Sequence, residues 1–261
     1  MSNYNYLGNI MSSSVFISGS IAIKTLPEPV KESILKIIGQ NMMILIGDAP
    51  GIDTLVQDFC KQNNYTNVTI YTITSSPRYI ANQSFDFKYI FVDSDIKKER
   101  ERQGHKDRAM SDDSTYSLVV WDGSSKGSYG NILSALKQKK QVKVFYQEIE
   151  DFIPTTQVNT EEIEYIYREH NGYTAAEVIE YLQNSGNDTY KRSQDLNKFL
   201  IAQNMLIKDG NIYQPTDKNP ELFIIEKYRG KPKGVKFNSE FIDWIEHQST
   251  NPSRQTDSLF D

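Results

Sequence analysis

The stretch Met43-Ile44-Leu45-Ile46-Gly47-Asp48-Ala49-Pro50-Gly51-Ile52-Asp53 decides the fold class of this chain. A short apolar run ends in a Gly-Asp turn, and a second glycine precedes a periodic apolar pattern: Ile52, Leu55, Val56, Phe59 and Cys60. This spacing places all five residues on one face of a helix. The stretch therefore predicts a buried strand, a tight turn and a helix N-terminus that can hold an anion. Any parallel α/β unit needs such a turn, so the turn alone does not identify a ligand site.

The composition predicts an ordinary globular protein without metal or disulfide chemistry. The chain has 261 residues, of which 38% are hydrophobic and 24% charged. A formal net charge of −5 argues against wholesale binding of nucleic acid or acidic membranes, while a local basic patch remains compatible with it. One cysteine and three histidines cannot build a structural zinc site or a disulfide framework. We expect Cys60 to be a buried thiol, and we expect neither a metal nor a cofactor.

The sequence predicts a cytoplasmic protein. Residues Met1–Ser14 are polar and lack the apolar core of a signal peptide. No later apolar run approaches the length that spans a bilayer, so we expect no membrane partner.

Apolar runs alternate with helical patterns through the first half of the chain. Strands are predicted at 15–17, 43–46, 67–73, 118–121 and 142–146, with a further short strand possible at 89–92, and helices at 27–39, 52–63, 96–110 and 129–140. Strands separated by helices predict an α/β fold with a mainly parallel, Rossmann-like sheet and helices on both faces. Most charges of the 96–110 segment are expected to form a solvated helix face, and the pattern is compatible with Lys106 and Asp107 as an ordinary pair on the helix surface.

Three loops follow the carboxyl ends of predicted strands: Ser18–Ser20, Gly47–Asp53 and Asp122–Ser128. Glycines let a backbone approach phosphate closely, Lys126 could neutralise charge, and aspartates could bind ribose hydroxyls. Three converging loops favour a nucleotide-like ligand over an empty scaffold. The candidate ligand-binding residues are Ser18, Gly19, Ser20, Gly47, Asp48, Gly51, Asp53, Arg78, Asp122, Gly123, Lys126, Gly127, Ser128 and Asn131. For Arg78, a surface ion pair is as compatible with the sequence as a phosphate contact.

The first domain resembles the SLOG superfamily over about residues 15–147. The resemblance rests on Ile17-Ser18-Gly19-Ser20, on the 47–53 loop with Gln57, and on Trp121-Asp122-Gly123 with Lys126-Gly127-Ser128 and Asn131. Lys106-Asp107-Arg108-Ala109-Met110 is similar to a segment of small bacterial SLOG-like proteins. The superfamily includes Lonely-Guy-type phosphoribohydrolases, the Rossmann domain of DNA processing protein A, and nucleotide-sensing domains of phage defence. The resemblance implies a pocket for a nucleotide or nucleotide-derived molecule.

The chain departs from the hydrolases of that superfamily at one position. They carry a Gly-Gly-x-Gly-Thr-x-x-Glu loop, whose glutamate takes part in breaking the N-glycosidic bond, and the matching place here ends in Asn131. An amide cannot act as an acid or base at neutral pH. Cleavage would therefore need Asp48, Asp53 or Asp122 as the replacement carboxylate.

A second, smaller α+β domain is predicted after a break in the pattern near residue 150. Thr174 and Glu177 have the spacing of a capping box, a second helix begins near Ser193, and Asp209-Gly210 predicts a hairpin. Helix, helix and two-stranded wing is the winged-helix order. Residues 172–246 also resemble, more weakly, the C-terminal domains of phage antirepressor proteins. The boundaries predicted are 1–14 polar segment, 15–150 SLOG-like domain, 151–171 linker and bridging helix, 172–248 winged-helix-like domain, and 249–261 disordered tail.

Three functions are compatible with these patterns. The first is binding of a nucleotide-derived small molecule, as a sensor, sponge or regulator in a bacterial or phage, defence-related context. The second is a nucleotide N-glycosidase or phosphoribohydrolase in which Asp48 or Asp53 supplies the carboxylate. The third is a DNA-binding regulator, for which the dense basic cluster is Lys227, Arg229, Lys231, Lys233 and Lys236. The C-terminal domain would bind DNA or a protein, and we expect a homo-oligomer.

Overall fold

The computed structural model describes residues 13–228 and 230–250. The chain divides into two compact units, residues 1–163 and 164–261, which are described separately below. The predicted polar segment 1–14 and tail 249–261 fall largely outside the described residues, and Arg229 lies outside them. Within the described ranges, every helix is too short or too polar to cross a membrane.

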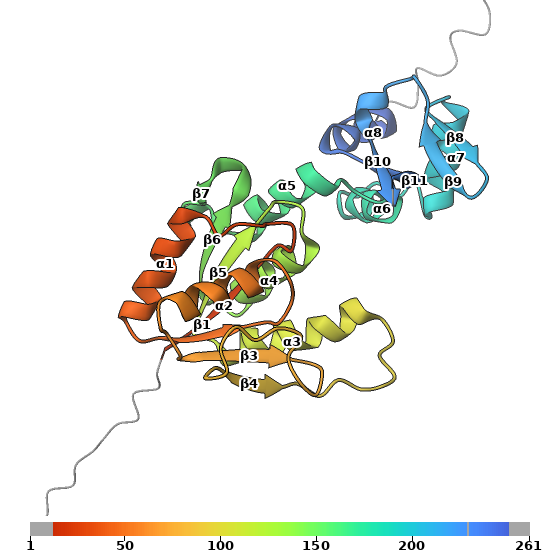
Figure 1. Ribbon diagram of the computed structural model, residues 1–261. Helices are drawn as coiled ribbons and strands as arrows, with labels where there is room; N and C mark the ends of the chain where they lie inside the picture. The colour runs from red at the N-terminus through yellow and green to blue at the C-terminus, as the bar shows by residue number, and fades with distance from the viewer. Residues whose placement is uncertain (1–12, 229, 251–261) are drawn as a thin grey trace, which may run out of the picture. The chain divides into compact units, whose positions relative to one another are not determined.

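The first unit is built on a seven-stranded sheet with the order β4-β3-β2-β1-β5-β6-β7 (Figure 1). All neighbouring strands are parallel except β6 and β7. The strands are β1 Ser14–Gly19, β2 Met43–Ile46, β3 Val68–Thr72, β4 Asp86–Tyr89, β5 Tyr116–Trp121, β6 Gln141–Tyr146 and β7 Asp151–Phe152. The predicted α/β class with a mainly parallel sheet is confirmed.

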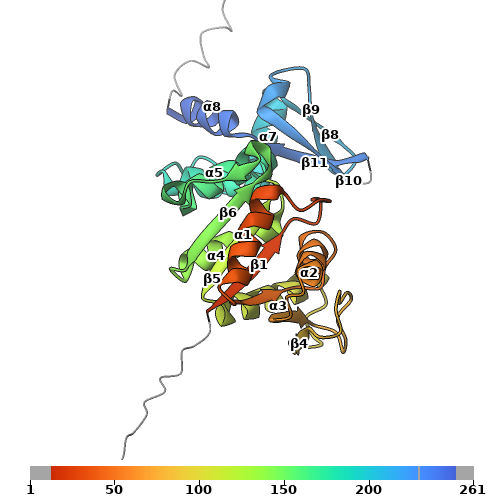
Figure 2. The same ribbon diagram turned by 60° about the vertical axis from the view of Figure 1, so that its left-hand side comes forward.

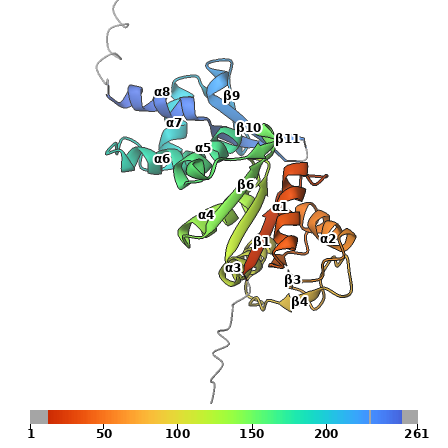
Figure 3. The ribbon, with the colours of Figure 1, turned by 90° about the vertical axis from the view of Figure 1, so that its left-hand side faces the viewer.

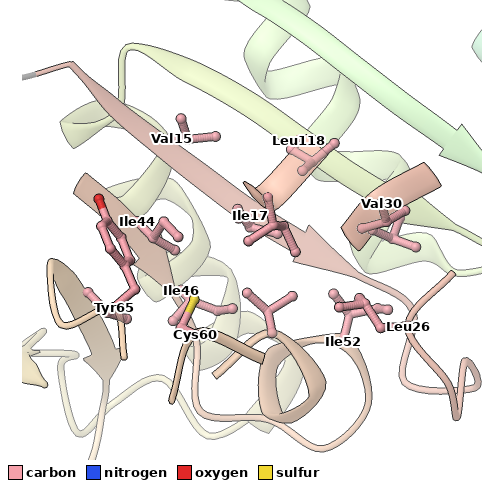
Figure 4. Packing of buried hydrophobic residues seen from close by; sticks show 14 of the residues in the cluster. Val15, Ile17, Leu26, Val30, Ile44, Ile46, Ile52, Cys60, Tyr65 and Leu118 are labelled. Carbon is pink, nitrogen blue, oxygen red and sulfur yellow. The ribbon is translucent and has the colours of Figure 1, made fainter. Parts of the chain in front are cut away.

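Helices cover both faces of this sheet. Figure 3 shows α1 and α2 on one side and α3 and α4 on the other. The bounds are α1 Glu28–Gly39, α2 Ile52–Gln62, α3 Glu99–Asp113 and α4 Lys126–Lys137. Alternate residues of a strand face opposite sides, so Ile17 packs toward α1 and α2, whereas Phe16 packs with Met110 of α3. Figure 4 shows the larger of the two cores, in which the predicted thiol of Cys60 is buried.

The opening stretch forms the predicted strand, turn and helix. The turn requires a glycine at position 51, where φ is +89° and a Cβ atom would lie 2.6 Å from the Cα of Ile21. Such a backbone conformation and such a contact exclude any side chain. The turn after β2 is therefore locked against the loop after β1.

Three predicted elements begin three residues away from their predicted starts. The helix expected from 129 begins at Lys126, because the Ser125 side chain caps it by accepting from the Ser128 N–H. The helix expected at 96–110 is α3, which begins at Glu99. The edge strand is Asp86–Tyr89 rather than 89–92, because those four residues pair in register with β3.

The second unit is α+β, with two antiparallel hairpins. Its elements are α6 Ala175–Asn184, α7 Ser193–Ala202, β8 Leu206–Asp209, β9 Ile212–Pro215, β10 Phe223–Tyr228, β11 Lys231–Phe237 and α8 Ser239–Thr250, and α5 Thr160–Asn171 spans the division between the units. The capping box of Thr174 and Glu177 is confirmed, as is the hairpin at Asp209-Gly210. Its core includes Leu196, Phe237 and Phe241. The pairing of β10 with β11 was not predicted.

Candidate functional site

A cavity of about 800 Å³ opens at the carboxyl ends of the parallel strands. The chain order reverses between β1 and its neighbour β5, and ligands of open α/β sheets bind at such a switch point. Helices α3 and α4 supply much of the wall. The lining includes Ser18, Gly19, Asp53, Arg78, Lys106, Asp107, Lys126, Gly127, Ser128 and Asn131.

Asp48 anchors a buried polar cluster next to this cavity. Its Oδ1 accepts from Arg78 Nη2 at 2.7 Å and from Lys106 Nζ at 2.8 Å. Its Oδ2 accepts from Thr72 Oγ1 at 2.9 Å and from the Arg78 backbone N–H at 3.1 Å. Burial alone would raise the pKa of Asp48, but the hydrogen bonds from Arg78 and Lys106 bring it well below its ordinary value. Both oxygens are thus occupied within the protein, and Asp48 does not line the cavity.

The sequence did not reveal that Lys106 is the buried ion-pair partner of Asp48. Lys106 was expected on a solvated helix face, but it is buried and pairs with Asp48 across 2.8 Å. The expectation was wrong for Lys106 because nothing in the charge pattern of α3 indicates which of its charges meets Asp48, a buried partner in the loop after β2. The only available signal was the similarity of the 106–110 segment to SLOG-like proteins.

Asp53 lies at the first turn of α2 and faces the cavity. Its Oδ2 accepts from the Ala49 N–H at 3.1 Å. A Cβ atom at position 47 would lie 2.3 Å from that oxygen and 3.0 Å from Lys106 Nζ, so Gly47 is what allows the two charged groups to come together. Burial raises the pKa of Asp53 to about 7, against the opposing effect of the Lys106 charge and the Ala49 N–H. Asp53 can therefore hold or release a proton near neutral pH.

Asp107 is a second carboxyl group on the cavity wall, and it was not among the predicted site residues. Burial raises its pKa, in opposition to the charges of Lys106 and Arg78. No described residue forms a hydrogen bond or ion pair with its carboxylate. The cavity wall thus carries two carboxyl groups with raised pKa values, one from α2 and one from α3.

The N-terminus of α4 forms the opposite part of the wall. Ser20 joins the loops after β1 and β5, because its Oγ lies 3.3 Å from Ser128 Oγ and accepts from the Asp122 N–H at 3.2 Å. Ser18 also lines the cavity, and its side-chain oxygen is buried without a hydrogen-bond partner in the described chain. An unsatisfied buried hydroxyl costs about 1–3 kcal/mol.

Four cationic side chains at the cavity have no acidic partner within the described ranges: Arg100, Arg108, Lys126 and Lys137. Lys126 begins α4, so its charge adds to the positive end of the helix dipole. Phosphate oxygens satisfy this combination of N–H groups and cations. The cavity therefore offers an anion-binding end and carboxyl groups that can bind hydroxyl or amine groups.

Some predicted residues shape the site without lining it: Ser20, Gly47, Asp48, Gly51, Asp122 and Gly123. The carboxylate of Asp122 accepts from the Ser124 and Ser125 N–H groups at 3.0 and 2.7 Å, so it holds the loop that precedes α4. Gly123 adopts a φ of +82° in that loop. Both residues position the α4 N-terminus.

The predicted nucleic-acid-binding lysines belong to the second unit, and none of them lines this cavity. Lys227 belongs to β10, and Lys231, Lys233 and Lys236 belong to β11, so one hairpin carries all four. Lys233 pairs with Glu226 at 3.6 Å, and both side chains are exposed. An exposed pair of this kind contributes little.

Comparison with known proteins finds limited similarity. No protein-family model matches the chain, and no curated protein matches it. Among solved structures, the chain is similar to DNA processing protein A from Helicobacter pylori, whose structure concerns a single-stranded DNA binding mode. The identity is 13%, the match covers 73% of this chain and 81% of that one, and the TM-score is 0.36. At these values the likeness carries no inference about ligand or activity.

Proposed function

We propose that the cavity binds a nucleotide or a nucleotide-derived small molecule. The observation that carries this proposal is that Lys126, which has no acidic partner in the described chain, and the N-terminus of α4 line the same cavity as the carboxyl groups of Asp53 and Asp107. A phosphate group would accept from the N–H groups of that helix turn and pair with Lys126. Ribose hydroxyls would donate to Asp53 or Asp107, whose carboxylates face the same space.

The chain also has a second unit, which could respond to ligand binding in the first. We propose a SLOG-like domain at 15–150 and a winged-helix-like domain at 172–248, joined by 151–171. The protein would act as a sensor, sponge or regulator in a bacterial or phage, defence-related setting. The second domain would pass the signal on to DNA or to a protein.

Binding can be tested with a panel of nucleoside 5′-mono- and diphosphates, after native mass spectrometry of the purified protein for a co-purified ligand. Lys126→Ala should weaken the binding of whichever panel member binds best by about tenfold, because it removes the free charge next to the phosphate. Lys139→Ala is the matched control, since Lys139 follows α4 outside the cavity lining and should leave the affinity unchanged. Binding of no panel member, or equal losses in the two variants, would contradict the proposal.

A second candidate function is cleavage of an N-glycosidic bond in a bound nucleotide. It is favoured by the presence of two cavity carboxyl groups, of which Asp53 has a pKa of about 7. A carboxyl group with such a pKa can donate a proton to a leaving base, and a second carboxylate can activate water or stabilise the cationic sugar. Asp48 is unsuited to either part, because both its oxygens already accept hydrogen bonds.

The enzyme hypothesis predicts release of free base when the protein is incubated with the nucleotide that it binds. Asp53→Asn should reduce that release by at least about 100-fold, as expected for loss of a general acid, while binding persists. Base release is measured by chromatography, and Asp58→Asn serves as a control on the same helix, outside the cavity lining. Tight binding without release of free base would contradict the enzyme hypothesis and support ligand binding alone.

DNA binding by the second unit is a third hypothesis. Its support is the concentration of lysines on the β10–β11 hairpin. The near balance of acidic and basic residues in that unit weighs against it.

A further inference from the structure

The outer strand of the parallel sheet is unusually exposed. Strand β4 pairs with β3 on one side, and no strand of the described chain pairs with its other side. Figure 2 shows β4 at the end of the sheet away from β6. All four of its residues are exposed, although strands of parallel sheets are normally covered on both faces. Its outer edge therefore presents unpaired backbone N–H and C=O groups.

Aromatic side chains line one face of this edge. Phe87 is 52% exposed and Tyr89 is 51% exposed, and Phe91, two residues further, is 76% exposed. Phe87 is in register with Ile70, which packs in the core under α2, so the aromatic face lies on the α2 side of the sheet. Proteins rarely leave adjacent aromatic groups on a free strand edge without an interaction that covers them.

The charges of β4 are complementary to those of a second copy. Directly opposite residues in an antiparallel pair lie on the same face of the sheet, so two copies of β4 related by a two-fold axis can pair with Phe87 opposite Phe87. In that register Asp86 of each copy lies opposite Lys88 of the other. If the two strands slide so that Lys88 rather than Phe87 lies at the two-fold axis, Lys88 lies opposite Lys88. Cross-strand pairs of opposite charge stabilise a sheet and like pairs destabilise it, so one register is selected.

The monomer leaves these charges available for that pairing. Asp86 has no ion-pair partner among the described residues. Lys88 pairs with Asp113 at 2.6 Å, but its side chain remains half exposed and can also reach a carboxylate across the edge. Neither residue lines the cavity described above.

We infer that two copies of this chain associate through antiparallel pairing of their β4 strands, which joins the two parallel sheets into one. The Phe87 rings meet at the two-fold axis, and two Asp86–Lys88 pairs flank them. The inference does not depend on the proposed function.

A charge exchange tests this interface. Asp86→Lys places lysine opposite Lys88 on both sides of the axis, and Lys88→Asp places aspartate opposite Asp86, so each variant alone should self-associate at least about tenfold more weakly than the wild type. An equimolar mixture of the two variants should form a heterodimer with wild-type affinity, because every cross-strand pair is then of opposite sign. Association is measured by sedimentation equilibrium over a concentration series.

The mixing experiment distinguishes loss of the interface from misfolding, because a misfolded variant could not restore association. Glu32→Lys, which makes the same charge change on the exposed part of α1, should leave the dimer intact. A wild-type protein that sediments as a monomer throughout would overturn the inference. Unchanged association of Asp86→Lys, or a mixture no stronger than its components, would equally overturn it.

Discussion

Replacement of Lys106 by methionine should lower the free energy of unfolding by about 3 kcal/mol. Lys106 is buried, and its Nζ lies 2.8 Å from Asp48 Oδ1. Methionine fills a similar volume but leaves the buried carboxylate of Asp48 with less compensation. Arg78 still donates to the same oxygen, which keeps the loss at the lower end of the range for a broken buried pair.

Denaturant unfolding of the variant and the wild type measures this loss. Lys137→Met is the matched control, because Lys137 is exposed, has no described ion-pair partner, and should change stability by less than about 0.5 kcal/mol. The double variant Asp48→Asn/Lys106→Met should be more stable than Lys106→Met alone, because the uncompensated charge is then absent. A Lys106→Met protein as stable as the control would show that the buried pair contributes nothing.

Replacement of Asp53 by asparagine should stabilise the protein at alkaline pH and have little effect in acid. The pKa of Asp53 is raised from 3.8 to about 7, so between these values the folded state holds a proton that the unfolded state has lost. Stability from this group is therefore fully present below about pH 4 and is lost as the pH rises to about 7. At about pH 8 the wild type carries a buried carboxylate, and asparagine should raise the free energy of unfolding by about 4 kcal/mol, because each unit by which the pKa is raised from 3.8 to about 7 is worth about 1.4 kcal/mol.

The measurement is the pH dependence of the unfolding free energy for Asp53→Asn and the wild type. Asparagine can still accept from the Ala49 N–H through its side-chain oxygen, so the local turn is retained. The two curves should converge at about pH 4 and separate toward about pH 8. A constant difference across the range would mean that Asp53 does not titrate between those limits. Asp95→Asn, at an exposed position outside the cavity lining, is the control for a charge change alone.

The expected changes in the free energy of unfolding have opposite signs for Lys106→Met and Asp53→Asn, and this difference bears on function. The Asp48–Lys106 pair holds the cavity wall together, and its loss destabilises the fold. Ionised Asp53 is expected to lower stability, which is common for groups that act on a ligand. A substitution that improves stability but harms binding or base release would identify Asp53 as a functional group.

The sequence determined the class of the fold because its evidence is local. The apolar run Met43–Ile46, the two glycines and the helical periodicity after Ile52 specify a strand, a turn and a helix without reference to the rest of the chain. The Thr174–Glu177 capping box and the Asp209-Gly210 hairpin are likewise short-range patterns, and both are present. Because parallel strands end at the same edge of a sheet, the sequence also predicts that the three loops lie close together.

Tertiary structure alone decided how charges are used at that edge. Asp48 and Lys106 are far apart in the sequence, and each of them is compatible by itself with a solvated position; burial as a pair depends on α3 packing over the end of β2. The same packing puts Asp107 on the cavity wall. Thr72 at the end of β3 and Arg78 in the loop after it add the hydrogen bonds that leave Asp48 without a free oxygen. The exposed edge of β4 likewise follows from strand order, which sequence periodicity does not encode. Ion pairing and desolvation act between residues that only the folded chain brings within reach of one another, so no local pattern can specify them.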